Sequence, residues 1–190
     1  MRRAWASLVA LHVVLAATAA SARAPRAAYV LAIGNNAPAE PAGATAATKE
    51  LRYADDDAVR YFLFLRQLAT QAHLLTVLDA DTVRRYPELA ASAQPPTLVN
   101  LRRALAEIRE AMRADLAAGR EPVLYFAFSG HGQVDEHGEA YLALEDGRLS
   151  QNVLYQEVID ELPARRVHMF IDACHAGAVV GVRGGMFGTE

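Results

Sequence analysis

The sequence predicts an α/β protein with a mainly parallel β-sheet that is covered by helices on both faces. Short runs that are almost entirely apolar alternate with longer segments whose apolar residues recur at helical spacing. Strands without polar alternation are typical of parallel sheets that are buried on both sides. Two of the apolar runs end in glycine-containing tetrapeptides with a His or a Cys, and the working residues of such sheets gather at the carboxyl ends of the strands.

Residues 1–24 have the pattern of a secretory signal peptide. Arg2 and Arg3 form a short cationic start, an uncharged run over residues 4–20 follows, and Ala22-Arg23-Ala24 fits an A-x-A cleavage site. The alternative is an uncleaved membrane anchor, since about 17 apolar residues are at the lower limit for spanning a bilayer. We expect cleavage and export to the periplasm or the medium, which leaves residues 25–190 as one domain.

The elements expected within this domain follow from apolar runs, helical spacing and turn residues. Apolar runs predict strands at 27–33, 73–78, 123–128 and 166–171, and a short hairpin strand at 139–144 after the turn at Gly138. Helical spacing predicts helices at 50–68, 98–118 and 152–162. Thr97 is the expected N-cap of the second helix, and Gly119 lies beyond its end. Residues 37–48 and 79–96 are predicted to be loops.

Composition and charge exclude several classes of protein. The formal net charge is −3, and without a basic surplus the chain has no means of neutralising nucleic-acid phosphates. The single Cys, Cys174, cannot form an internal disulfide and provides no C-x-x-C metal or redox motif. In an oxidising compartment a lone thiol favours an intermolecular disulfide or a reactive role.

His131 and Cys174 come directly after two apolar runs, so we expect them at neighbouring strand ends. A thiol and an imidazole brought together there can perform nucleophilic acyl transfer, because the imidazole takes the thiol proton and returns it to the leaving amine. The flanking glycines let the backbone approach a developing oxyanion closely. The amides of Gly132 and Cys174 are the expected oxyanion donors. We interpret His175 as a neighbour and not the base, because adjacent strand residues point to opposite sides.

These motifs resemble the caspase and metacaspase peptidase family. Ser129-Gly130-His131-Gly132 follows one apolar run, and Asp172-Ala173-Cys174-His175-Ala176-Gly177 follows another, with 43 residues from His131 to Cys174. The caspase signature likewise places a His about 50 residues before the Cys. Tyr53-Ala54-Asp55-Asp56-Asp57-Ala58 resembles the Asn-Asp-Ala segment of the family. The resemblance covers about residues 27–180 and implies a caspase-like three-layer sandwich, with Cys174 as nucleophile and His131 as base and acid.

The resemblance also implies an acidic, metacaspase-like substrate pocket. Asp172 stands where caspases have Gln, and the region of Asp55 to Asp57 stands where they have a cationic residue. Alignment on Asp-Ala favours Asp57 as the pocket acid, and Ala54 and Ser129 match further pocket positions. Such a pocket attracts Arg or Lys and repels Asp. The alternatives are that the three Asp residues only favour the helix N-terminus and that Asp172 only binds a neighbouring loop.

No cofactor is expected, although some metacaspases need Ca²⁺. The acids near the predicted hairpin lack the oxygen-ligand spacing of an EF-hand, and a solvated hairpin is the favoured interpretation; they are Asp135, Glu136, Glu139, Glu145 and Asp146.

The residues after Cys174 are few, small and rich in glycine, whereas the family continues into further strands. We therefore expect the caspase-like domain to lack its C-terminal strands and to expose a sheet edge, which another chain could complete. The leading hypothesis is an exported cysteine endopeptidase that cuts after Arg or Lys, and its expected partner is a protein or peptide substrate. The alternative is a non-catalytic interaction module that keeps the caspase-like fold.

Overall fold

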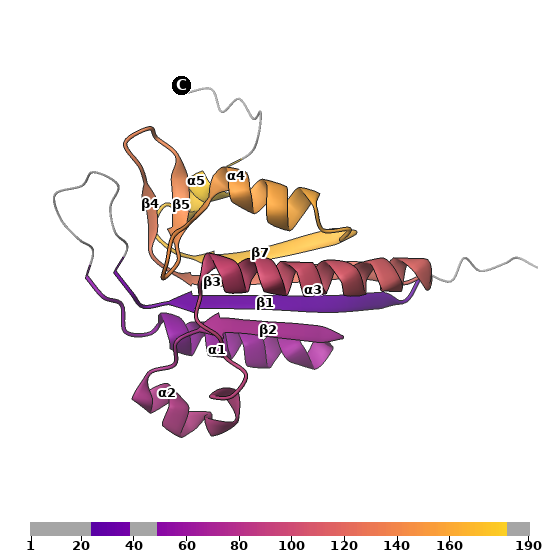
Figure 1. Ribbon diagram of the computed structural model, residues 1–190, viewed down its shortest axis with the longest axis horizontal. Coiled ribbons are helices and arrows are strands. Elements are labelled where there is room, and N and C mark those ends of the chain that lie inside the picture. Colours follow the sequence, from indigo (N-terminus) through magenta and orange to yellow (C-terminus); the bar gives the residue numbers. More distant parts are fainter. Residues whose placement is uncertain (1–23, 39–48, 182–190) are drawn as a thin grey trace, which may run out of the picture.

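The computed structural model describes residues 24–38 and 49–181, and its centre is a four-stranded parallel sheet. The strands are β1 (Arg26–Asn35), β2 (Gln71–Thr76), β3 (Glu121–Gly130) and β7 (Arg166–Asp172), in the order β2-β1-β3-β7 (Figure 1). Each predicted long strand is present within a few residues of its expected bounds. The predicted α/β fold class is confirmed.

Helices pack on both faces of this sheet because the buried strands alternate in side-chain direction. Tyr29, Leu31 and Ile33 of β1 pack in one cluster with helix α3 (Leu98–Ala117), whereas Ala32 packs in another with helix α1 (Ala54–Leu65). α3 crosses in front of the sheet in Figure 1. The result is the three-layer sandwich that the resemblance implies.

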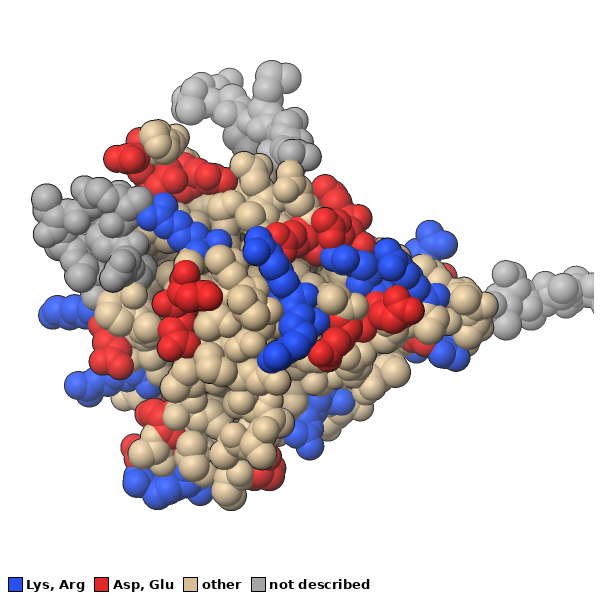
Figure 2. Space-filling view, viewed as in Figure 1, with Lys and Arg blue, Asp and Glu red and all other residues tan. Residues whose placement is uncertain are grey.

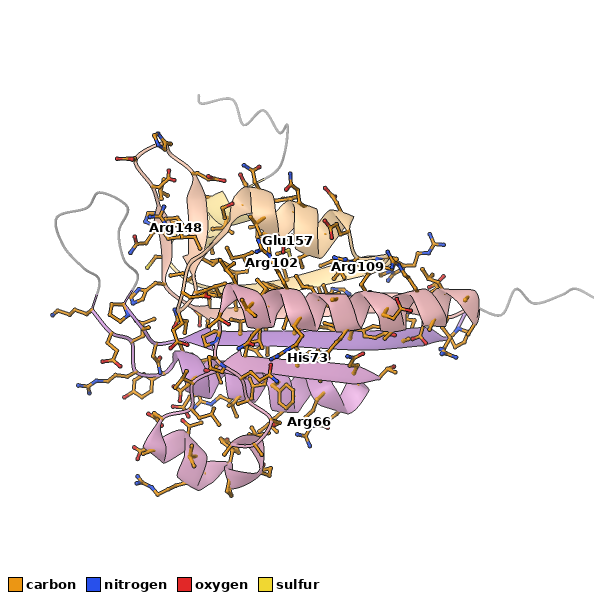
Figure 3. All side chains as sticks on the ribbon, in the orientation of Figure 1. Arg66, His73, Arg102, Arg109, Arg148 and Glu157 are labelled. Atoms are coloured by element: carbon orange, nitrogen blue, oxygen red, sulfur yellow. The ribbon has the colours of Figure 1, made fainter. Side chains whose placement is uncertain are left out.

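The α3 layer extends over β7 through a second helical segment. α4 (Gln151–Val153) continues into η3 (Leu154–Asp160), a π-helix that buries Leu154 and Val158 in the α3 cluster. Arg102 of α3 donates to both carboxylate oxygens of Glu157 on η3, at 3.0–3.2 Å (Figure 3). On the face shown in Figure 2, positive and negative side chains of the described residues lie next to one another and form no large patch of one sign.

A small antiparallel sheet and a short helix lie beside the carboxyl ends of β3 and β7. The strands are β4 (Gly132–Val134), β5 (Ala140–Ala143) and β6 (Arg148–Ser150), in the order β4-β5-β6. Helix α5 (Ala176–Val179) follows β7 closely. The expected hairpin is therefore present, and Leu142 and Leu149 anchor it to the main core.

The first predicted helix begins at Ala54 and not at residue 50, because a side chain distant in sequence caps it. The Asn36 side-chain oxygen accepts from the Ala54 amide at 2.8 Å, and the Leu51 amide donates to the Asn36 carbonyl at 2.8 Å. These bonds keep residues 50–53 outside the helix. The α-helix ends at Leu65, and a 3-10 turn, η1 (Arg66–Leu68), completes the predicted length.

The prediction of a structureless loop over residues 79–96 is wrong. It contains helix α2 (Ala80–Arg85) and the 3-10 helix η2 (Pro87–Leu89). Asp79 caps α2 by accepting from the Thr82 amide at 2.7 Å, and Leu89 is buried against the α1 side of the sheet. One side-chain cap and one buried apolar residue accompany these two short helices. The helices themselves are too short to show a helical periodicity of apolar residues in the sequence.

Strand β7 lies at the edge of the sheet and pairs, among the described strands, only with β3. Val167, Met169 and Ile171 pack against the α3 cluster, whereas His168 and Phe170 on the opposite side are exposed. Phe170 is 38% exposed, and its ring contacts that of Tyr61 of α1, with 5.7 Å between ring centroids. The expected free edge is thus present within the described residues, and its coverage by another chain stays a prediction.

The predicted signal peptide falls on residues 1–24, and residues 1–23 lie outside the described part of the chain. Among the helices of residues 24–38 and 49–181, none combines the length and apolar character that a membrane span requires.

Candidate active site

Strand register brings the two predicted catalytic residues to neighbouring strand ends. Ser129 of β3 and Asp172 of β7 are paired in the parallel ladder. His131 follows Ser129 by two residues, and Cys174 follows Asp172 by two residues. The loops that leave the two strands also touch, because a Cβ added at Gly132 would lie 2.0 Å from the carbonyl oxygen of Cys174. The segments holding the thiol and the imidazole are therefore in direct contact.

Cys174 lies in a turn between β7 and α5, and its side chain reaches solvent. His175 has φ 56° and ψ 18°, the left-handed conformation that non-glycine residues rarely adopt. This residue reverses the chain directly after the candidate nucleophile. Cys174 and His175 do not continue the strand as predicted, because β7 ends at Asp172, so strand alternation does not determine where the His175 side chain points.

The side chain of His131 is held by a backbone group from the segment before α1. Its Nε2 lies 2.8 Å from the carbonyl oxygen of Lys49. A carbonyl oxygen can only accept, so Nε2 carries the hydrogen and, in the neutral ring, Nδ1 has the free electron pair. The contact thereby selects the tautomer in which Nδ1 is the proton acceptor.

The backbone of Gly132 faces away from its partner strand. The Ala143 amide donates to the His131 carbonyl at 2.9 Å, which makes this pair a hydrogen-bonded position of the antiparallel ladder. Gly132, paired with Leu142, therefore occupies the next, non-hydrogen-bonded position, where N–H groups point away from the partner strand. The ladder with β5 leaves this amide free for another acceptor.

One pocket of about 440 Å³ contains Cys174 and all four residues predicted to bind substrate. Ala54 and Asp57 come from the start of α1, and Ser129 and Asp172 come from the ends of β3 and β7. Ala54 and Ser129 are buried, which leaves Asp57 and Asp172 as the pocket's accessible carboxylates. The remaining wall comes from residues that the sequence analysis did not assign to substrate binding: Leu51, Arg52, Tyr53, Gly130 and Ala173.

The three consecutive acids of α1 have different partners. Asp55 is fully buried and accepts from the Asn36 side chain at 2.7 Å and from the Asp79 amide at 3.0 Å. Asp56 pairs with Arg85 of α2 at 3.0 Å. These two acids tie α1 to neighbouring segments, and Asp57 is the one that lines the pocket. All three also lie in the first helical turn, where the helix dipole favours negative charge.

A second pocket, of about 350 Å³, adjoins the first, and Cys174 is not among the residues that line it. It shares Asp57 and Asp172 with the first pocket and is completed by Arg60, Tyr61 and Phe64 of α1. Arg60 donates to the carboxylate of Asp57 at 2.9 Å. The two acids are thus shared by this pocket and the pocket that contains the thiol.

Two of the acids considered for Ca²⁺, Asp135 and Asp146, accept hydrogen bonds from backbone amides. Asp135 accepts from the amides of Glu139 and His137, both at 2.9 Å, which holds the pKa of its carboxyl below the usual range and closes the hairpin turn. Asp146 accepts from the Leu98 amide at 2.8 Å, at the start of α3. Within residues 24–38 and 49–181, no three His, Cys, Asp or Glu side chains gather as a metal ion would require.

Sequence reasoning missed Asn36, Lys49 and Arg60. Asn36 and Lys49 act over 18 and 82 residues of sequence separation, and the Lys49 contact uses a carbonyl that every residue type has. Neither carries a local signal. Arg60 did carry one, because Asp57 and Arg60 are three residues apart on a helix, where such pairs meet.

The sequence was compared with protein families and with curated proteins. The family model described as Caspase domain matches residues 27–186, which is most of the chain. The comparison with curated proteins finds no match. Membership of this peptidase family supports cysteine peptidase activity in general. On the breadth of that match, together with the parallel sheet and the Cys and His motifs at its strand ends, the chain belongs to the caspase domain family.

Proposed function

We propose that this protein is an exported cysteine endopeptidase that cleaves peptide bonds after Arg or Lys. The observation that carries the proposal is the pocket that contains both Cys174 and the carboxylates of Asp57 and Asp172. A nucleophile and an acidic binding site in one pocket are what cleavage after a basic residue requires. Export is supported by the N-terminal sequence pattern alone.

In the first half of the reaction, the sulfur of Cys174 attacks the carbonyl carbon of the scissile bond. His131 takes the thiol proton at Nδ1 and gives it to the leaving amine when the C–N bond breaks, which leaves a thioester on Cys174. The Lys49 carbonyl supports this role because it holds the proton on Nε2. Water then attacks the thioester, with His131 taking the water proton and returning it to the sulfur.

The amides of Gly132 and Cys174 are the proposed donors to the oxyanion. The ladder position of Gly132 supports this role, since its N–H has no partner on β5. The close packing of Gly132 on the Cys174 carbonyl supports it as well, because the two backbones approach where a side chain would separate them. Donors already in place stabilise the developing charge without reorganisation.

Substitution of the nucleophile tests the mechanism. In the parent, an Arg-ended chloromethyl ketone should label Cys174 stoichiometrically, and a small Arg-ended amide should be hydrolysed. Cys174→Ala should abolish both results while unfolding at the temperature of the parent, because the side chain is exposed and packs little. An alanine variant that hydrolyses the amide as fast as the parent would refute the mechanism. A parent that is neither labelled nor active would favour the non-catalytic module.

Charge removal tests the specificity. Asp172→Asn should lower kcat/KM for Arg substrates by about tenfold or more, since a carboxylate–guanidinium contact in a pocket is worth roughly 1.5–3 kcal/mol. Asp160→Asn, an exposed acid at the end of η3, is the matched control and should leave kcat/KM unchanged. Equal turnover of Asp-ended and Arg-ended substrates by the parent would contradict the proposed specificity.

A further inference from the structure

Arg60 is a cation that the chain itself supplies to its own acidic pocket. Its guanidinium contacts Asp57 at 2.9 Å, from one helical turn further along α1. Asp57 lines the pocket that contains Cys174, and both Asp57 and Arg60 line the adjoining pocket. The arginine therefore contacts the carboxylate from the adjoining pocket.

We propose that Arg60 competes with the basic side chain of the substrate for Asp57 and so weakens the pocket's affinity for a cation. The inference rests on the proposed function, because the competing ligand is the Arg or Lys at the cleavage position. In the free protein, the positive charge of Arg60 offsets the negative charge of Asp57. The ion pair also occupies one oxygen of the Asp57 carboxylate, Oδ1.

The exposure of the pair sets the size of the effect. The Arg60 side chain is 62% exposed and that of Asp57 is 30% exposed, so solvent screens their attraction. An ion pair of this kind can be displaced by a substrate and does not block the pocket. Loss of Arg60 should therefore raise cation affinity by about two- to fivefold, the range that corresponds to exposed ion pairs.

The test combines binding and kinetics on the full chain. Benzamidine, a small aromatic amidinium, probes the acidic pocket by calorimetry without any need for catalysis. Arg60→Gln should lower the Kd of benzamidine and the KM of an Arg-ended amide by about two- to fivefold and leave kcat unchanged. Arg113→Gln is the matched control, since Arg113 is 64% exposed and pairs with Glu110 in the same three-residue spacing on α3. It should change none of these values.

A double variant separates competition from a general change in helix α1. In an Asp57→Asn background, Arg60→Gln should have no effect on benzamidine binding, because the group for which Arg60 competes has lost its charge. An affinity gain that persists in that background, or a single variant that binds benzamidine no tighter than the parent, would overturn the inference. If binding tightens as expected but no variant hydrolyses the amide, the inference stands and the proposed peptidase function fails.

Discussion

Replacing Gly132 with alanine would place a methyl carbon 2.0 Å from the carbonyl oxygen of Cys174 and 3.1 Å from the Cβ of Ala173. Contacts of a Cβ below 3.0 Å essentially do not occur, so the two loops must separate by about 1 Å. The obstructing atom belongs to the backbone and cannot move aside by rotating a side chain. The substitution therefore displaces the segment that holds His131 from the segment that holds Cys174.

The expected loss of activity follows from that displacement. A misplacement of about 1 Å in a catalytic arrangement costs on the order of 100-fold in rate, or roughly 2.7 kcal/mol in the activation free energy. Overpacking typically costs about 1–3 kcal/mol in stability, which leaves an ordinary domain folded. Gly132→Ala should therefore be folded but about 100-fold slower.

Hydrolysis of an Arg-ended amide and thermal unfolding measure the two effects separately. Gly177→Ala is the matched control, because Gly177 is close to Cys174 in sequence but a Cβ added there meets nothing within 4 Å. This control should keep full activity and gain slightly in stability, since alanine favours helix α5. If Gly132→Ala kept kcat/KM within about threefold of the control, the reasoning that the two loops are in tight contact would be refuted.

Three further predictions concern stability. Tyr29→Phe should lower the free energy of unfolding by about 1–3 kcal/mol, because the buried Asp115 carboxylate loses the hydroxyl that donates to it at 2.7 Å; chemical denaturation measures the change. Hydrogen bonds from Arg120 and then from Tyr29 hold the pKa of Asp115 below its usual value, so this carboxylate stabilises the fold above about pH 4 and loses that effect as the pH falls through its folded pKa. The stability difference between the parent and Asp115→Asn should accordingly shrink on acidification below about pH 4, and a constant difference from pH 7 to pH 2 would contradict it. His175→Gly should raise the melting temperature slightly, because glycine removes roughly 1 kcal/mol of left-handed strain; a lower melting temperature would show that the His175 side chain contributes more than its backbone costs.

The sequence alone determined the fold class and the segments that carry chemistry. A nearly continuous apolar run is typical of a strand in a parallel sheet that is covered on both faces. This pattern can be read from each run by itself, without knowledge of the rest of the fold. The same holds for the Thr97 cap, whose side chain accepts from the Asn100 amide three residues later at 3.2 Å. His131 and Cys174 could be singled out because strand ends are readable as the points where apolar runs stop.

Only the tertiary structure decided which acid faces the pocket and how His131 is held. Asp55, Asp56 and Asp57 are chemically identical and adjacent, and they differ only in what surrounds them after folding: a buried amide network, Arg85 of α2, and the pocket. The Lys49 carbonyl contacts His131 only because β1, β3 and α1 bring distant segments together at the carboxyl ends of the strands. Such contacts depend on the register and crossing of elements, and these are set by packing of the whole core and not by any local stretch of sequence.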